Sequence, residues 1–121
     1  MPLYWTGKAF DNKAHSFESV QGHEINLKEL DSLELFYYRN VKGIYYIVEK
    51  NTGISLSNGK DTDEAYDKLK EVLTRYTVKE ITDRIKNQIE EYGTVPKENP
   101  IKLGDVVKRE PKRLSDYHVR Y

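Results

Sequence analysis

The residues best suited to metal or acid–base chemistry are three histidines, and none has a partner at a useful spacing. His15, His23 and His118 lie in no His-x-Glu or His-Glu-x-x-His pattern. The chain contains no cysteine, which excludes thiolate metal sites, cysteine nucleophiles and disulfides. We interpret these histidines as scattered surface residues. We therefore predict no catalytic, cofactor-binding or metal-binding residue.

A group of acidic residues is the next candidate for a metal site. Asp61, Asp63, Glu64 and Asp67 are close in sequence, but their spacing does not match a calcium loop. They stand at the expected start of a helix, where the helix dipole favours negative charge. The sequence also has no Gly-x-Ser-x-Gly elbow and no glycine-rich phosphate loop. These observations predict a protein that is not an enzyme.

Tyrosine is the unusual feature of the composition, with ten in 121 residues. Four of them, Tyr37, Tyr38, Tyr45 and Tyr46, lie in two neighbouring apolar runs and are candidates for partner binding. Because alternate side chains of a strand share a face, Tyr45 and Tyr46 point to opposite faces. Either the sheet is covered on both faces, by helices and by the N-terminal segment, or one face shows tyrosines to solvent or to a partner.

These runs predict the strands that position the tyrosines. Aromatic and β-branched residues bounded by Asn and Gly indicate three antiparallel strands, roughly 33–39, 43–50 and 53–57. Gly53 is expected to supply the positive φ of the second turn. Before them, residues 4–10 and 16–20 predict a hairpin, and Asn26 is expected to cap a single helical turn.

Two amphipathic helices are expected to follow the sheet. Asp61 with Glu64, and Thr77 with Glu80, have the spacing of capping boxes. The apolar stripe of the first helix, which ends near Tyr76, is Ala65, Leu69, Val72, Leu73 and Tyr76. That of the second is Val78, Ile81, Ile85, Ile89 and Tyr92, with Gly93 as the C′ residue. Each stripe must be buried, and the sheet is the obvious surface.

The character of the chain changes after Gly93. Residues 94–100 contain two prolines and are typical of a linker, and residues 101–107 add a short strand or pack as an extended arm. We therefore place a single domain at 1–93 and a linker with a C-terminal arm at 94–121. The arm supplies a second group of partner-binding candidates: Lys108, Arg109, Lys112, Arg113, Tyr117 and Tyr121. The alternative interpretation is that the charged residues of the arm form a solvated tail that binds no partner.

The charge balance bears on the class of partner. The chain has 20 basic and 20 acidic residues, which argues against a dedicated non-specific nucleic-acid binder. Residues 94–121 hold seven basic and four acidic residues, so a local basic tail is compatible with nucleic acid. No apolar run has the length of a signal peptide or membrane helix, and cysteine is absent. We expect a cytoplasmic protein with no membrane partner.

Residues 45–65 resemble a pattern in small accessory proteins of bacterial phages and conjugative elements. There, a strand ending in Glu-x-x-Thr-Gly is followed by a Gly-Lys-x-Thr turn into a helix starting Glu-Ala. The matching residues are Tyr45 to Ser55, Gly59-Lys60, Thr62 and Glu64-Ala65. This resemblance implies a mobile-element protein such as an inhibitor of host defence, in the manner of anti-CRISPR proteins. The element order also resembles the arm-type DNA-binding domain of tyrosine integrases, which is markedly more basic.

Together these patterns predict an α+β domain. It has an antiparallel sheet of about four to five strands, with two consecutive amphipathic helices packed on one face. The predicted function is a non-enzymatic protein-binding module whose partner the sequence does not identify. The alternative is a nucleic-acid-binding accessory protein that uses an aromatic sheet face and the basic tail. The open edges of the sheet also allow a homodimer.

Overall fold

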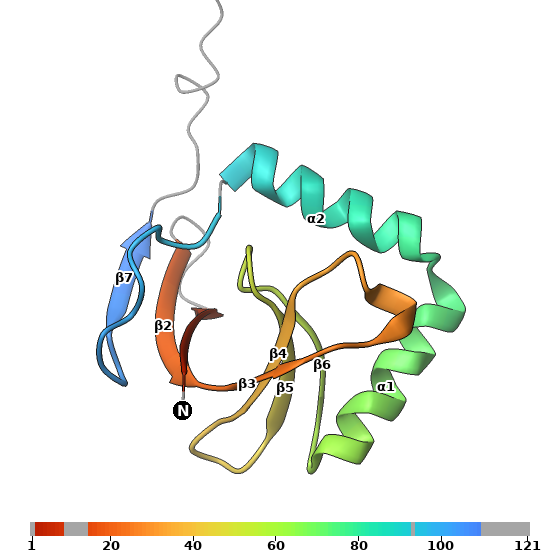
Figure 1. Cartoon of the computed structure of the whole chain (residues 1–121), viewed down its shortest axis with the longest axis horizontal. Helices are drawn as coiled ribbons and strands as arrows, with labels where there is room; N and C mark the ends of the chain where they lie inside the picture. The colour runs from red at the N-terminus through yellow and green to blue at the C-terminus, as the bar shows by residue number, and fades with distance from the viewer. Residues whose placement is uncertain (1, 9–14, 93, 110–121) are drawn as a thin grey trace, which may run out of the picture.

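The structure is a computed structural model that describes residues 2–8, 15–92 and 94–109. It has the predicted α+β class (Figure 1). The strands are β1 (Leu3–Lys8), β2 (His15–Gln21), β3 (His23–Ile25), β4 (Leu35–Arg39), β5 (Tyr45–Glu49), β6 (Ser55–Gly59) and β7 (Val106–Arg109). The helices are a 3-10 turn η1 (Lys28–Leu30), α1 (Thr62–Arg75) and α2 (Val78–Tyr92).

The strands form two antiparallel sheets instead of the single sheet expected. One has three strands in the order β1-β2-β7, and the other has four in the order β3-β4-β5-β6. The chain passes from one sheet to the other at Gly22, between β2 and β3. A Cβ at this position would lie 2.8 Å from Cδ2 of Phe36 and 2.9 Å from Cδ2 of Tyr4. Only a glycine lets the backbone turn this corner against the two rings.

The rings beside this corner begin the core between the two sheets. Tyr4 of β1 stacks on Phe36 of β4, with ring centroids 4.4 Å apart and an interplanar angle of 11°. Tyr38 and Val48 complete this buried cluster. Stacked rings bury a large apolar area and fix the distance between the layers. The three-stranded sheet therefore covers one face of the four-stranded sheet.

Helix α1 covers the opposite face. The buried cluster there is Ile25, Leu30, Leu35, Ile47, Ala65 and Leu69. At its centre, the Ser57 hydroxyl of β6 donates a hydrogen bond to the backbone oxygen of Ala65 at 2.8 Å. The centre of both faces is thus covered, by a helix and by the N-terminal strands, as the first of the two alternatives expected, while Tyr37 and Tyr45 on the α1 face stay half-buried.

The two predicted helix starts are confirmed. Oδ1 of Asp61 accepts a hydrogen bond from the backbone N–H of Glu64 at 2.8 Å, and α1 follows directly. At the next start, the Thr77 hydroxyl oxygen accepts from the backbone N–H of Glu80 at 3.1 Å, and the Glu80 carboxylate accepts from the N–H of Thr77 at 3.2 Å. These side chains satisfy N–H groups that the first helical turn leaves free.

Helix α2 begins next to the end of α1 and runs across one end of the four-stranded sheet rather than flat on its face (Figure 1). Its inner side and the C-terminal half of α1 line a pocket with the start of β6. Ile81 and Ile85, from the predicted stripe, are buried on its inner side. The expected C′ residue, Gly93, falls outside the described residues.

The predicted cap of the short helical turn is wrong. Asn26 does not cap it: η1 starts after Leu27, and no side-chain hydrogen bond caps that end. The backbone supplies the contact instead, because the N–H of Leu30 donates to the oxygen of Leu27 at 3.0 Å. Burial of the Leu30 side chain fixes this turn against the core.

Residues after position 93 contact both sheets. The N–H of Val95 donates to the oxygen of Asn51 at 2.9 Å. The indole Nε1 of Trp5 donates to the oxygen of Glu98 at 2.8 Å, and β7 pairs with β2. A short strand is therefore present, as one of the two alternatives expected, but it spans Val106–Arg109 rather than 101–107. Residues 94–109 hydrogen-bond to elements on the other side of the expected domain boundary.

Candidate functional site

The four candidate tyrosines of the sheet divide between its two faces. Tyr38 is paired in register with Tyr46, and both side chains face the three-stranded sheet. Tyr37 and Tyr45 lie on the face that α1 covers. This division follows from the alternation of side chains along a strand.

Tyr38 belongs to the core rather than to a binding surface. It is 7% exposed, and its ring stacks on that of Tyr46 with centroids 5.4 Å apart. Burial raises the pKa of the Tyr38 hydroxyl above its ordinary value, while a hydrogen bond with the Thr6 side chain acts in the opposite direction. Tyr46 is half-buried and packs against the same cluster. Neither ring is free to take up a partner without loosening the contact between the sheets.

The other two tyrosines, Tyr37 and Tyr45, belong to a row of neighbouring rings that begins at His23. The imidazole of His23 stacks on the ring of Tyr37 with centroids 4.9 Å apart, and Tyr37 meets Tyr45 at 6.1 Å. Tyr66 of α1 lies close enough to Tyr37 for the two hydroxyl groups to interact electrostatically. The pKa of Tyr66 is raised, first by burial and then by Tyr37. We call His23, Tyr37, Tyr45 and Tyr66 the aromatic surface.

The aromatic surface is partly open to solvent. Its three tyrosines are half-buried, with Tyr37 and Tyr66 leaning on the core, and His23 is exposed. Arg39 is exposed at the end of β4 and is paired in register with Tyr45. Four rings from three strands and one helix thus lie together, with a cation beside them.

His23 and Tyr66 were absent from the predicted candidates. His23 joins the rings only through β3, a strand of three residues that no sequence pattern indicated. Tyr66 follows Ala65 directly on α1, so an aromatic residue beside the apolar stripe was the available signal.

The candidates in the C-terminal arm lie largely outside the described residues. Lys108 and Arg109 belong to β7, where they are in register with Ser16 and His15 of β2. The other four, Lys112, Arg113, Tyr117 and Tyr121, fall beyond residue 109. The structure therefore does not bring the arm and the tyrosines of the sheet together as one described site.

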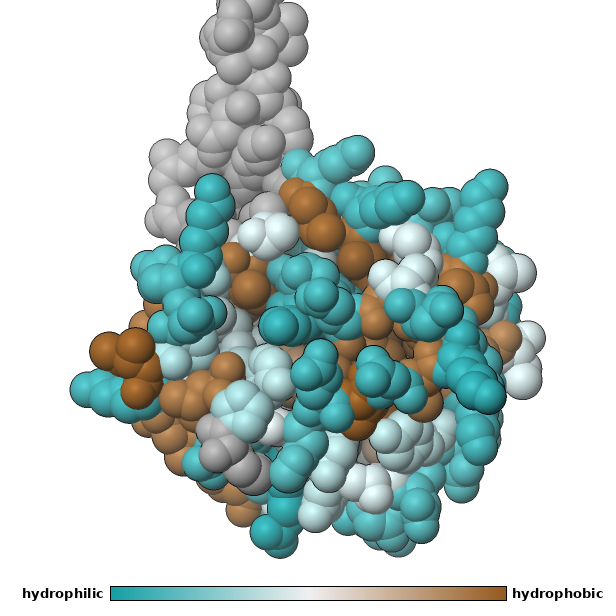
Figure 2. Space-filling view, in the orientation of Figure 1, coloured by the Kyte–Doolittle hydropathy of each residue, from teal (hydrophilic) through white to brown (hydrophobic). Residues whose placement is uncertain are grey.

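A pocket lies between α1, α2 and the start of β6, away from the aromatic surface, and sequence reasoning missed it. It is a pocket of about 420 Å³ with mainly apolar walls. The apolar wall residues are Ile54, Leu56, Leu69, Val72, Ile81 and Ile85. Apolar surface is visible below α2 between hydrophilic side chains (Figure 2). Three separate elements build this pocket, so no single stretch of sequence indicated it.

The described residues contain no group of three or more His, Asp or Glu side chains that could hold a metal ion. Neither described helix is both long and apolar enough to cross a membrane. Comparison with protein-family models, curated proteins and solved structures gave no match to this chain. The function must therefore be argued from the surfaces themselves.

Proposed function

We propose that this chain is a non-enzymatic protein-binding module that docks its partner on the aromatic surface. The observation that carries the proposal is the row of stacked and tilted rings, His23, Tyr37 and Tyr45, which is left partly open beside Tyr66. Aromatic residues are enriched at protein interfaces and dominate their binding energy.

The rings are also held in place before any partner arrives. Tyr37 and Tyr66 contact the buried core, and the neighbouring rings restrict one another. A ring that is already fixed loses little conformational entropy on binding, so more of its contact energy becomes affinity. Exposed flexible side chains, by contrast, must be ordered during association.

The experiment compares two tyrosine variants in a pull-down from bacterial lysate that is split into nuclease-treated and untreated halves. Tyr45→Ala removes a ring from the aromatic surface, and Tyr76→Ala removes an exposed tyrosine elsewhere, at the end of α1. The proposal expects a partner that survives nuclease treatment and binds Tyr45→Ala roughly thirtyfold more weakly, which is typical of one hot-spot ring. Tyr76→Ala should bind as the wild type does.

Circular dichroism and thermal melting of both variants check that folding is unchanged. A partner that binds Tyr45→Ala as tightly as the wild type would contradict the proposal. Loss of the partner with both variants would also contradict it, because binding would then not depend on this surface.

A second candidate function is binding of single-stranded nucleic acid on the same rings. The observation in its favour is Arg39, an exposed cation in register with Tyr45 at the end of the ring row. Bases stack on aromatic side chains of sheets, and arginine contributes to phosphate contact. This alternative expects partners that vanish on nuclease treatment and an affinity for an RNA probe that falls steeply with salt.

The pathway in which the module acts stays a prediction. The resemblance to phage and conjugative-element proteins rests on residues 45–65, and in this fold many of these build a turn and a helix start. A role in a mobile element, such as inhibition of host defence, is proposed from this resemblance alone and not from the geometry of the aromatic surface. Identification of the captured partner by mass spectrometry tests it.

A further inference from the structure

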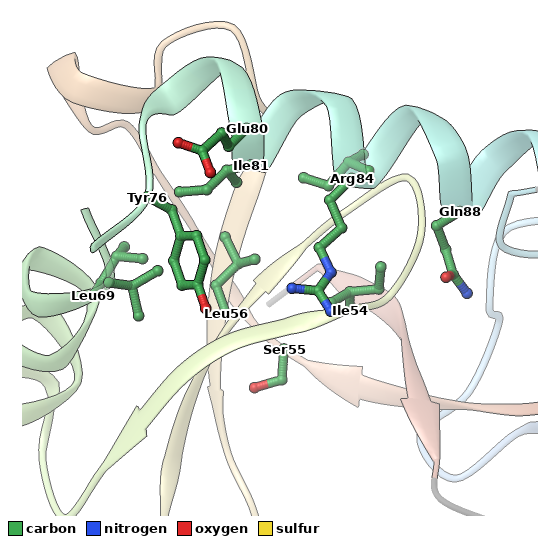
Figure 3. A pocket seen from close by; sticks show the side chains of 11 residues that line it. Ile54, Ser55, Leu56, Leu69, Tyr76, Glu80, Ile81, Arg84 and Gln88 are labelled. Carbon is green, nitrogen blue, oxygen red and sulfur yellow. The ribbon is translucent and has the colours of Figure 1, made fainter. Parts of the chain in front are cut away.

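The pocket beneath α2 has the size and wall chemistry of a small-molecule site. Its volume of about 420 Å³ falls within the roughly 300 to 1,000 Å³ of ligand pockets in proteins, which are mostly apolar with a few polar groups. Ile81 of α2 faces Leu56 of β6 across it, and Tyr76 closes the end next to α1 (Figure 3). Ile85 of α2 also lines the pocket. None of these residues belongs to the aromatic surface.

The two charged residues that line the pocket, Glu80 and Arg84, differ in whether their side chains already have a partner within the described residues. Glu80 is occupied at the start of α2, where its carboxylate accepts hydrogen bonds from the N–H and the hydroxyl of Thr77 at 3.2 Å. Arg84, one turn further along, reaches down from α2 toward Ile54 (Figure 3). Within the described residues Arg84 forms no ion pair. Among residues 2–8, 15–92 and 94–109, no carboxylate pairs with this guanidinium at the edge of an apolar pocket.

We infer that this pocket binds a small amphipathic carboxylate, such as an unbranched medium-chain fatty acid. The apolar chain lies between Leu56 and Ile81, and the carboxylate pairs with the guanidinium of Arg84. Arginine holds a carboxylate through two parallel N–H···O contacts, which neither an alcohol nor an amine can reproduce. Gln88 lies one turn beyond Arg84 on the same side of α2 and offers an amide to the same headgroup (Figure 3).

The test uses decanoate and 1-decanol as probes, which share a chain length and differ in the headgroup. Binding is measured by calorimetry and by amide shifts in ¹⁵N–¹H spectra of the full chain. We expect decanoate to shift amides of residues 54–56 and 76–88. Arg84→Ala should weaken decanoate about tenfold, the loss typical of one hydrogen bond to a charged group. It should leave the weaker binding of 1-decanol unchanged.

Arg75→Ala is the matched control, because Arg75 is an exposed arginine near the end of α1 that does not line the pocket. It should bind decanoate as the wild type does. Equal binding of decanoate and 1-decanol to the wild type would overturn the inference, as would equal weakening by Arg75→Ala. Decanoate-induced amide shifts outside the pocket would also overturn it. So would shifts that depend on the protein concentration and not on the decanoate concentration, because a second copy of the chain would then fill the pocket.

The inference is independent of the proposed protein-binding function. Tyr45→Ala lies outside the pocket and is expected to keep full decanoate affinity. Loss of the protein partner in that variant therefore bears only on the aromatic surface, and loss of decanoate binding in Arg84→Ala bears only on the pocket.

Discussion

The side chain of Glu49 accepts hydrogen bonds from both donor groups of Thr52, its backbone N–H and its hydroxyl. One carboxylate oxygen accepts hydrogen bonds from the backbone N–H of Thr52 at 2.9 Å and from its hydroxyl at 3.0 Å. The other accepts from the backbone and side-chain N–H groups of Asn51, at 2.9 and 3.1 Å. Glu49 has no exposed surface. A buried carboxylate with four donors closes the turn between β5 and β6, which carries one wall of the pocket.

This arrangement predicts that Glu49→Gln destabilises the fold. The amide keeps the shape of the side chain, but its NH₂ group faces donors and its oxygen accepts without a charge. Loss of hydrogen bonds to a buried charged group costs about 2 to 3 kcal/mol in the free energy of unfolding, measured by urea titration. Glu34→Gln, at an exposed position just before β4, is the control and should be neutral. Equal stability of both variants would show that the four contacts contribute little.

The helices and the central strands were predictable because their signals are local. Asp61 with Glu64, and Thr77 with Glu80, mark helix starts within four residues, and each start holds in the structure. Gly53 was expected at positive φ and has φ +73°. These features need no knowledge of distant residues, since each cap or turn is satisfied by its own neighbours.

The features that were missed, or left as one of two alternatives, depend on distant partners. Strand β3 was missed and owes its pairing to β4, and β7, which was expected only as an alternative to an extended arm, pairs with β2. Each is short, and neither carries the alternation that identifies a strand by itself. The ring of His23 could join the aromatic surface only once β3 was known. The sequence offered four sheet tyrosines as candidates, but which of them is buried depended on which layer covers each face.

Gly22→Ala is predicted to destabilise the corner between the sheets. The added methyl group would press on the rings of Phe36 and Tyr4 at less than 3.0 Å. Such overpacking costs about 1 to 3 kcal/mol in the free energy of unfolding, measured by urea titration. Gly104→Ala is the control for loss of a glycine as such. Its Cβ would meet no atom within 4 Å, which leaves only the strain of φ +90°. A cost for Gly104→Ala as large as that for Gly22→Ala would argue against close approach as the cause.

Buried tyrosines predict a loss of stability in alkaline solution. Burial raises the pKa of Tyr38 above its ordinary value of 10.0, so the folded chain holds this proton more tightly than the unfolded chain does. The contribution to stability is complete below pH 10.0 and is lost as the pH rises through the higher folded-state pKa. Tyr38→Phe should therefore lose less stability than the wild type between about pH 8 and about pH 11, followed by urea unfolding. An identical loss in both proteins would assign the alkaline effect to Tyr4 and Tyr66, whose pKa values are also raised.

The segment after α2 is predicted to be part of the folded unit. Trp5 is the only tryptophan in the sequence, is 6% exposed, and donates its indole N–H to Glu98. A chain that ends at Tyr92 loses this acceptor and the pairing of β7 with β2. We expect its tryptophan emission to shift to the red and its unfolding midpoint in urea to fall, because the indole becomes hydrated and β2 loses a neighbour. A chain that ends at Arg109 keeps every one of these contacts and should retain the wild-type emission. Wild-type emission and midpoint in the shorter chain would instead show that residues 1–92 fold without the strand that follows them.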